Sequence, residues 1–393
     1  MYYPIQMNGN TLTFYINTLF SIFIFQLYLA PIMLRLQHIT LFQFKNYLKN
    51  EFAFTQKVIG ICGKNGLGKT NLLDAIYYLC FTKSYFAKTD HNIVQHGLQG
   101  MRLEGNFIKN EIPEKIVCII RENNKKEILR NEEEYKRFSK HIGQFPVVMI
   151  APDDVELVTG LSETRRKFID TMCCQLDSGY LQNLIDYNKI LQQRNSLLKS
   201  SAEKGLLNES LLEILNNQLV KSGNYIFTFR KDFLQNFLHN VAERYNQIAG
   251  TKDVVQLSYC SHLFEDAFEN LLQTYKAKDM LLQRTTIGVH RDDIELKLSN
   301  EPFKNTASQG QKKSLLFAMK LQEFEEIKKS KGFSPILLLD DVFEKLDTER
   351  MNNLLMQICL HSDSQIFITD TDKDRLNNAL TRIGVSYQSI DME

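Results

Sequence analysis

GKNGLGKT, at residues 63–70, fits the phosphate-binding pattern G-x-x-x-x-G-K-[ST]. Glycines in such a loop let backbone N–H groups turn inward around phosphate oxygens, and the start of the following helix adds partial positive charge. Lys69 is expected to reach the β and γ phosphates and to serve catalysis, and the Thr70 hydroxyl is placed to ligate Mg²⁺. The motif predicts an ATP site formed by Gly63, Lys64, Asn65, Gly66, Leu67, Gly68, Lys69 and Thr70.

The segments on either side of this loop suit a nucleotide-binding fold. Lys57–Cys62 is short, apolar and β-branched, as a buried parallel strand requires. Thr70–Phe81 places its apolar residues at the spacing of a helix that faces a core. A glycine-rich turn that matches by chance is the plain alternative, and the strand–loop–helix context weighs against it.

Two acidic residues follow a second apolar strand. Ile336–Leu339 ends at Asp340 and Asp341, so both carboxylates are expected at the carboxyl edge of the sheet, where the phosphate loop also opens. Asp340 suits Mg²⁺ through water, and Asp341 is placed to orient or deprotonate the attacking water. A solvated strand end would carry the same residues, but the loop on the same chain favours catalysis.

A short polar motif begins the helix predicted for Ser308–Glu326. Ser308, Gly310 and Gln311 can present a hydroxyl and free N–H groups to an anion. An ordinary helix N-cap would look the same. The motif lies about 30 residues before the acidic pair, where ABC-type ATPases carry their signature sequence, which in that family faces the nucleotide of a second subunit.

The order of patterns along the chain predicts an α/β core interrupted by a helical insertion. Alternation from Leu34 predicts a strand, a turn at residues 45–47 and a second strand near Asn50–Phe54, and residues 100–150 have further strand patterns. Helical periodicity dominates from Asp153 to about Tyr275, and α/β character returns after Thr285. We therefore divide the chain into an extension (1–32), an ATPase lobe in two parts (33–152 and 281–393) and a helical lobe (153–280).

The composition narrows the class of protein. The 393 residues are 44% apolar and 24% charged, which excludes a disordered chain. Lys and Arg total 47 against 46 for Asp and Glu, so any contact with DNA must come from a local patch. Arg165, Arg166 and Lys167 are the candidates for phosphate contact, and one face of a solvated helix is the alternative. The seven cysteines lack CxxC spacing, which favours reduced thiols over disulfides or zinc.

The N-terminal 34 residues contain no charged residue, and hydropathy alone predicts a membrane helix within residues 11–34. The stretch lacks a basic leader and a small-residue cleavage site, and the pattern of a soluble domain begins at Met33. We interpret residues 1–32 as a mis-assigned start or a dispensable extension. A membrane anchor is the alternative.

Several further motifs make the chain similar to the RecF family, in the order that this family shows. They lie from Met33 to about Asp372 and comprise GKNGLGKTNLL (63–73), Pro152 to Asp154 with Gly160 and 165–170 (RRKFID), 186–188 (DYN) with 193–195 (QRN), GVHRDD (288–293), 308–311 and 338–342. The resemblance implies an SMC-like ABC ATPase head with a helical second lobe. It also implies a cytoplasmic protein that dimerises on ATP, hydrolyses it slowly with stimulation by DNA, and grips double-stranded DNA near single-strand gaps. The family works with RecR and RecO to help RecA replace single-strand-binding protein.

Three departures from the RecF pattern limit how far the family's residue roles can be assigned to this chain. Val289 replaces a proline, which should matter little if the residues that follow hold their places. Glu344-Lys345-Leu346-Asp347 differs from the usual Ser-Glu-Leu-Asp and puts the cross-subunit contacts of that loop in doubt. Lys45 replaces an arginine, so a point charge replaces a bidentate phosphate contact. The other readings are another soluble SMC-like ABC ATPase, an ATP-binding interaction module, and a membrane-linked ABC transport ATPase.

Overall fold

The computed structural model describes residues 34–250, 254–341, 355–360 and 362–393. The predictions for residues 1–32 and for Glu344 to Asp347 lie outside these ranges. Within them, no helix combines the length and the apolarity needed to cross a membrane.

A parallel sheet of five strands carries the phosphate loop. Its order is β14-β3-β13-β12-β8, and every neighbouring pair is parallel. The bounds are β14 Tyr387–Asp391, β3 Val58–Cys62, β13 Ile366–Asp370, β12 Ile336–Leu339 and β8 Val147–Ile150. All residues of β3, β8, β12 and β13 are buried, because helices or strands cover both faces. The strands predicted at 57–62 and 336–339 are confirmed.

An antiparallel sheet of six strands packs against the same core. Its order is β2-β1-β4-β5-β6-β7. Side chains of this sheet, of α2 (Lys69–Phe81) and of β3 and β8 form one hydrophobic core. The bounds are β1 Leu34–Phe44, β2 Tyr47–Ala53, β4 Met101–Lys109, β5 Ile112–Ile120, β6 Lys126–Arg130 and β7 Glu133–Glu134. The predicted strands near the start of the described chain and within 100–150 are confirmed, as is the helix after the loop.

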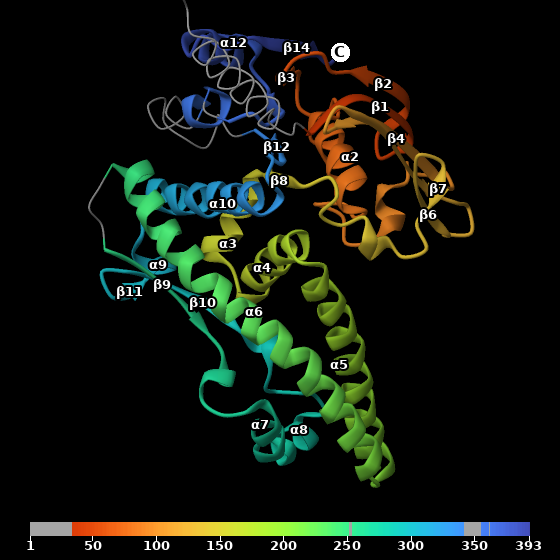
Figure 1. Cartoon of the computed structure of the whole chain (residues 1–393), viewed down its shortest axis with the longest axis vertical. Helices are drawn as coiled ribbons and strands as arrows, with labels where there is room; N and C mark the ends of the chain where they lie inside the picture. The colour runs from red at the N-terminus through yellow and green to blue at the C-terminus, as the bar shows by residue number, and fades with distance from the viewer. Residues whose placement is uncertain (1–33, 251–253, 342–354, 361) are drawn as a thin grey trace, which may run out of the picture.

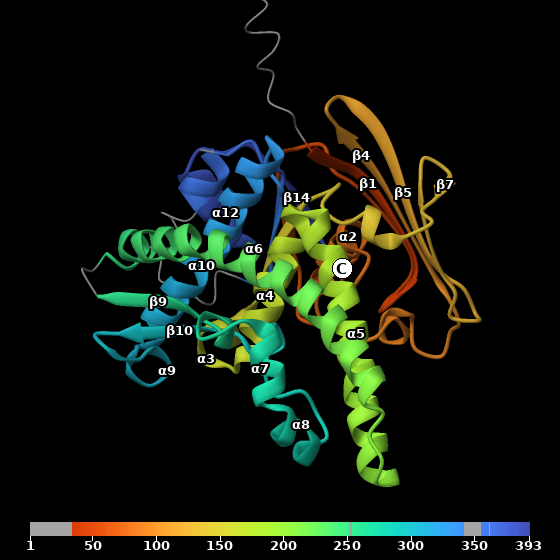
Figure 2. The same cartoon turned by 60° about the horizontal axis from the view of Figure 1, so that its bottom comes forward.

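The helical lobe extends away from both sheets (Figure 1). Its bounds are α3 Glu156–Thr159, α4 Ser162–Leu176, α5 Ser178–Lys204, α6 Glu209–Ala249, α7 Phe268–Thr274 and α8 Lys276–Leu282. The long helices α5 and α6 pack side by side as a hairpin whose tip lies far from the sheets (Figure 2). Single-turn helices are η1 Asp90–Ile93, η2 Phe138–Lys140, η3 Pro152–Val155, η4 His262–Phe264, η5 Val289–Arg291 and the π-type η7 Met356–Leu360.

A small third sheet belongs with this lobe. Its order is β11-β10-β9, with β9 Val255–Cys260, β10 Asp293–Leu298 and β11 Glu301–Pro302, followed by α9 Phe303–Thr306. Ile287, Ile294 and Phe303 are buried in one core with the side chains of α4, α5 and α6. We therefore propose that the helical lobe continues past residue 280 to about Ala307.

The helix that begins at the polar motif lies between the lobes. This helix, α10, runs from Gln309 to Lys331, which confirms the helix predicted from Ser308. Leu315 and Met319 pack in the core of the helical lobe, whereas Phe317 and Phe324 pack against β8 and β12 together with α12 (Lys373–Arg382). Because α10 buries opposite faces in two cores, its position couples one lobe to the other.

Candidate nucleotide-binding site

The phosphate loop connects β3 to α2 and contains glycines with positive φ angles. Gly66 has a φ of 87° and Gly68 a φ of 103°. A Cβ atom on Gly68 would lie 2.6 Å from the side-chain nitrogen of Asn46 and 2.8 Å from the hydroxyl of Tyr47. Only glycine satisfies both the backbone angle and the packing at this position.

Lys69 lies inside the loop rather than in solvent. Its side chain is buried, and its Nζ donates hydrogen bonds to the carbonyl oxygens of Gly63 at 2.7 Å and Lys64 at 3.2 Å. The ammonium is thus held at the centre of the cradle that the loop backbone forms. Its contact with phosphate stays a prediction.

The structure brings Thr70 and Asp340 together, although they lie 270 residues apart. The Thr70 hydroxyl lies 3.0 and 2.9 Å from the two carboxylate oxygens of Asp340. The Thr369 hydroxyl donates a hydrogen bond to the same carboxylate at 2.8 Å. Burial raises the pKa of the Asp340 carboxyl above its ordinary value. These hydroxyl and carboxylate oxygens are the hard ligands that Mg²⁺ prefers, so the donor set fits the predicted metal site.

Asp341 follows in a strained backbone conformation. Its φ is 44°, and its backbone N–H donates a hydrogen bond to the Thr369 hydroxyl at 2.9 Å. Thr369 therefore joins the ends of β12 and β13 at the edge where the loop opens. Thr369 was not among the predicted site residues, although its position at the end of an apolar stretch and before Asp370 was a usable signal. The catalytic role of Asp341 stays a prediction.

The turn between β1 and β2 supports the loop from outside. The Tyr47 hydroxyl donates a hydrogen bond to the Gly68 carbonyl oxygen at 2.9 Å, and Asn46 accepts one from Asn71 of α2 at 2.7 Å. The ammonium of Lys45, expected to offer a point charge to phosphate, lies 2.6 Å from the buried carboxylate of Asp74 in this structure. Its charge therefore serves the packing of α2.

The polar motif at the start of α10 forms a capping box. The Ser308 hydroxyl accepts a hydrogen bond from the Gln311 N–H at 3.2 Å, and the Gln311 side chain accepts one from the Ser308 N–H at 2.8 Å. The plain N-cap is therefore present. The motif is also exposed enough for a second molecule to reach it, and its Gln309 lines a small cavity with Asp340. Cross-subunit contact by Ser308, Gly310 and Gln311 stays a prediction.

The basic cluster on α4 is largely committed to contacts within the chain. Arg165 donates to both oxygens of Asp293, at 2.6 and 2.9 Å, and Arg166 donates to the carbonyl oxygen of Asp292 at 2.7 Å. Ion pairing to Asp293 leaves Arg165 poorly placed for DNA phosphate. Lys167 is exposed and borders a cavity between the lobes.

The motif at residues 288–293 scaffolds the helical lobe. Burial lowers the pKa of His290 to about 4, and this neutral ring lies 2.7 Å from the Tyr187 hydroxyl. Asp292 accepts a hydrogen bond from the buried Arg230 at 2.7 Å, and Arg230 also donates to the backbone carbonyl oxygen of Val289 at 2.8 Å. Because Arg230 binds the backbone carbonyl of residue 289, this contact does not require the proline that the family has there.

Comparison with known proteins identifies the family. The model of the RecF/RecN/SMC N terminal domain matches residues 35–392. A DNA replication and repair protein RecF from Flavobacterium johnsoniae is 42% identical over 342 residues, which cover 87% of this chain and 95% of that protein. This chain belongs to the RecF family. The RecF protein of Bacteroides thetaiotaomicron is 36% identical and covers 90% of this chain and 95% of its own length.

Solved structures agree with RecF membership and with the fold. A structure of the recombination mediator protein RecF-ATP in the RecFOR pathway superposes with a TM-score of 0.82 at 29% identity, covering 88% of this chain and 94% of that one. An Smc head domain from Pyrococcus furiosus gives a TM-score of 0.52 at 17% identity, covering 92% and 94%, and shows the fold alone. The predicted resemblance to RecF and the predicted ABC/SMC-type ATPase head with a helical insertion are confirmed.

Proposed function

We propose that this chain is an ATP-driven DNA clamp of recombinational repair and replication restart, acting in the cytoplasm. Two copies would close around Mg-ATP, and closure would raise affinity for double-stranded DNA at single-strand gaps. The observation that carries the proposal is the convergence of Thr70, Asp340 and Thr369 beside the phosphate loop. RecF relatives are named for DNA replication and repair, and one solved relative holds ATP.

The geometry of the loop supports the chemistry that we assign to its residues. Backbone N–H groups at the start of α2 would bind phosphate oxygens, and Lys69 would exchange its two carbonyl partners for the β and γ phosphates. Thr70 and Asp340 would hold Mg²⁺, which neutralises phosphate charge when bound. Asp341 would orient or deprotonate the attacking water as a general base.

The second copy would complete the site. We assign Ser308, Gly310 and Gln311 to the γ-phosphate of ATP held by the other copy, because the start of α10 is exposed and its N–H groups suit an anion. Hydrolysis would then separate the copies and release DNA. The same clamp would cooperate with RecO and RecR in loading RecA.

Light scattering of purified protein with saturating Mg-ATP tests this proposal. Lys69→Ala is expected to abolish ATP-dependent dimerisation, because the β and γ phosphates lose the ammonium of Lys69. Asp341→Asn is expected to trap the dimer, because it blocks hydrolysis. Lys49→Ala, an exposed lysine on β2, is the control and should resemble the wild type. Equal dimer fractions in the wild type and in both site variants would refute the proposal.

A DNA-stimulated release of phosphate separates the clamp from an ATP-binding interaction module. The clamp predicts faster release with gapped duplex than without DNA, because DNA stabilises the closed dimer in which hydrolysis occurs. An unchanged rate with gapped duplex would favour the module.

A further inference from the structure

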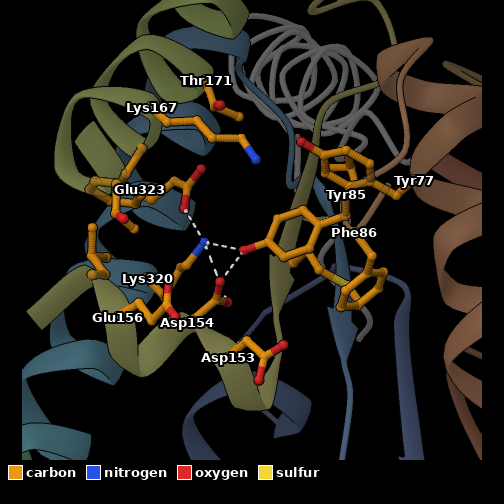
Figure 3. Close-up of a pocket in the computed structure, with 15 residues that line it drawn as sticks. Tyr77, Tyr85, Phe86, Asp153, Asp154, Glu156, Lys167, Thr171, Lys320 and Glu323 are labelled. Atoms are coloured by element: carbon orange, nitrogen blue, oxygen red, sulfur yellow. Dashed lines mark hydrogen bonds and ion pairs between the residues drawn. The ribbon is translucent and has the colours of Figure 1, made fainter. Parts of the chain in front are cut away.

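A cavity of about 230 Å³, lined by both charged and apolar side chains, lies where α2, α4 and α10 meet. It contains the group that we call the interlobe cluster, namely Tyr85, Asp154, Lys320 and Glu323. Figure 3 shows these side chains converging from the loop after α2, from η3 and from α10, with Lys167 of α4 reaching in from the opposite wall. The cluster therefore joins segments from both lobes.

Lys320 is buried, with two carboxylates at ion-pair distance and one hydroxyl at hydrogen-bond distance. Its Nζ lies 3.7 Å from Asp154 and 3.6 Å from Glu323, which are ion-pair distances too long for hydrogen bonds. The Tyr85 hydroxyl, at 3.2 Å, is the one acceptor within hydrogen-bond distance of this ammonium among the residues that the structure describes. The same hydroxyl donates to the Asp154 carboxylate. Removal of that single oxygen would leave the buried ammonium with two ion pairs but no hydrogen-bond acceptor, and would take a donor from the Asp154 carboxylate.

Tyr85 is itself anchored to the helix that begins at the phosphate loop. Its backbone N–H donates to Asp74 of α2 at 2.7 Å, and its ring packs edge-on against Tyr77 of α2 with the centroids 5.0 Å apart. Ser84 and Lys45 bind the other oxygen of Asp74. A shift of α2 would therefore move the Tyr85 hydroxyl.

Lys320 in turn lies on the helix that presents Ser308 to Gln311. At about 1.5 Å per residue, Lys320 is about 18 Å along the axis of α10 from Ser308. Its ammonium also lies 5.3 Å from the ring centroid of Phe168 in α4. Asp154, the other partner of Tyr85, accepts a hydrogen bond from the Ala151 N–H at 2.8 Å, at the end of β8.

We propose that the Tyr85 hydroxyl is a latch that holds α10, and with it Ser308 to Gln311, in register with the phosphate loop. Tyr85 is a positioning residue, since it acts through Lys320 and not on nucleotide. The inference rests on the proposed function, because the register of α10 matters only if its first residues meet ATP held by a second copy.

Tyr85→Phe tests the latch, with two constants measured on each protein. A fluorescent ATP analogue gives the nucleotide affinity of the monomer, and sedimentation across protein concentrations gives the dimer dissociation constant with Mg-ATP. Loss of the bridge is expected to weaken the dimer about tenfold, because a hydrogen bond to a charged group is lost, while the monomer affinity changes less than about twofold. Asp154→Asn is expected to behave in the same way, and serves alone if Tyr85→Phe does not fold.

Tyr180→Phe is the matched control. Its hydroxyl also bridges a carboxylate and a cation, namely Asp170 and Arg230, but within the helical lobe. It is expected to lower stability without weakening the dimer. The latch would be overturned, but not the proposed function, if Tyr85→Phe dimerised like the wild type. The same would hold if Tyr180→Phe weakened the dimer as much as Tyr85→Phe does. A wild type that stays monomeric with Mg-ATP would remove both the latch and the proposed function.

Discussion

The carboxylate of Asp340 is the point at which three segments of the nucleotide-binding site meet. Its carboxylate lies within hydrogen-bond distance of hydroxyls from two other segments, Thr70 at the start of α2 and Thr369 in β13. Thr369 also accepts the N–H of Asp341, so one hydroxyl orders both acidic residues. The predicted metal ligand and the predicted general base are therefore supported by the same threonine.

Thr369→Val tests this support with almost no change of shape. The buried site would lose two hydrogen bonds, so we expect a stability loss of about 1–3 kcal/mol and slower ATP turnover. Urea unfolding and a phosphate-release assay measure the two effects. Thr381→Val, on the exposed face of α12, is the control. Unchanged turnover in Thr369→Val would show that the acidic pair is ordered without the hydroxyl.

Glu323 predicts a pH dependence of stability. Burial raises its pKa from 4.5 to about 7, against the opposing effect of Lys320 and with a further rise from Asp154. The folded chain therefore holds the proton more tightly than the unfolded chain, and stability should fall by up to about 3 kcal/mol as pH rises from about 4.5 to 7. Glu323→Gln should flatten this slope in urea titrations, whereas Glu325→Gln should retain it. If the wild type and both variants lost stability equally with rising pH, a group other than Glu323 would cause the pH dependence.

At the scale of elements, α10 combines two roles in one helix. Its start carries the capping box of Ser308 and Gln311, and its middle carries Lys320 between the lobes. A cap stabilises the helix in any context, so its presence alone does not decide whether the motif also meets a second copy.

Ser308→Asp separates the two roles. Aspartate caps helices about as well as serine, so stability should remain within about 0.5 kcal/mol of the wild type. The added negative charge should abolish ATP-driven dimerisation if the motif faces the phosphates of the other copy. Ser308→Ala is the comparison, since it should cost about 1 kcal/mol. A Ser308→Asp protein that still dimerises with ATP would leave the motif as a cap only.

The periodicity of apolar residues predicted some helices and strands and missed others. The strand β3 and the helices α2 and α10 were predicted because each has a strong pattern and a clear beginning. The strand β9 was missed, although its residues alternate between exposed and half-buried, because it is short and lies among long helices. Its partner β10 follows more than thirty residues later, and a pairing at that distance leaves no local mark.

At the scale of the whole molecule, charge is balanced rather than basic. The net charge is +1, and Arg165 of the basic cluster is neutralised by Asp293. Under the proposed clamp, attraction to DNA would arise when two copies come together and place their exposed cations on one surface. Affinity for DNA should depend on nucleotide for this reason.

Gel shifts on gapped duplex at several salt concentrations test this expectation. Affinity should fall more steeply with salt in the presence of ATP than in its absence, with a slope of about −0.9 per phosphate contact. Arg165→Ala should leave the slope unchanged and lower stability, because its partner is Asp293. A reduced slope in Arg165→Ala would restore this residue as a DNA contact.

The sequence by itself determined the features that depend on neighbours along the chain. The loop from Gly63 to Thr70, the strand before it and the helix after it need only local backbone angles and a local apolar pattern. Tertiary structure alone decided which charged groups remain available. Lys320 meets Tyr85 across 235 residues, and Arg165 meets Asp293 across 128. A buried charge must find a partner, and folding, not sequence proximity, determines which group is close enough to serve.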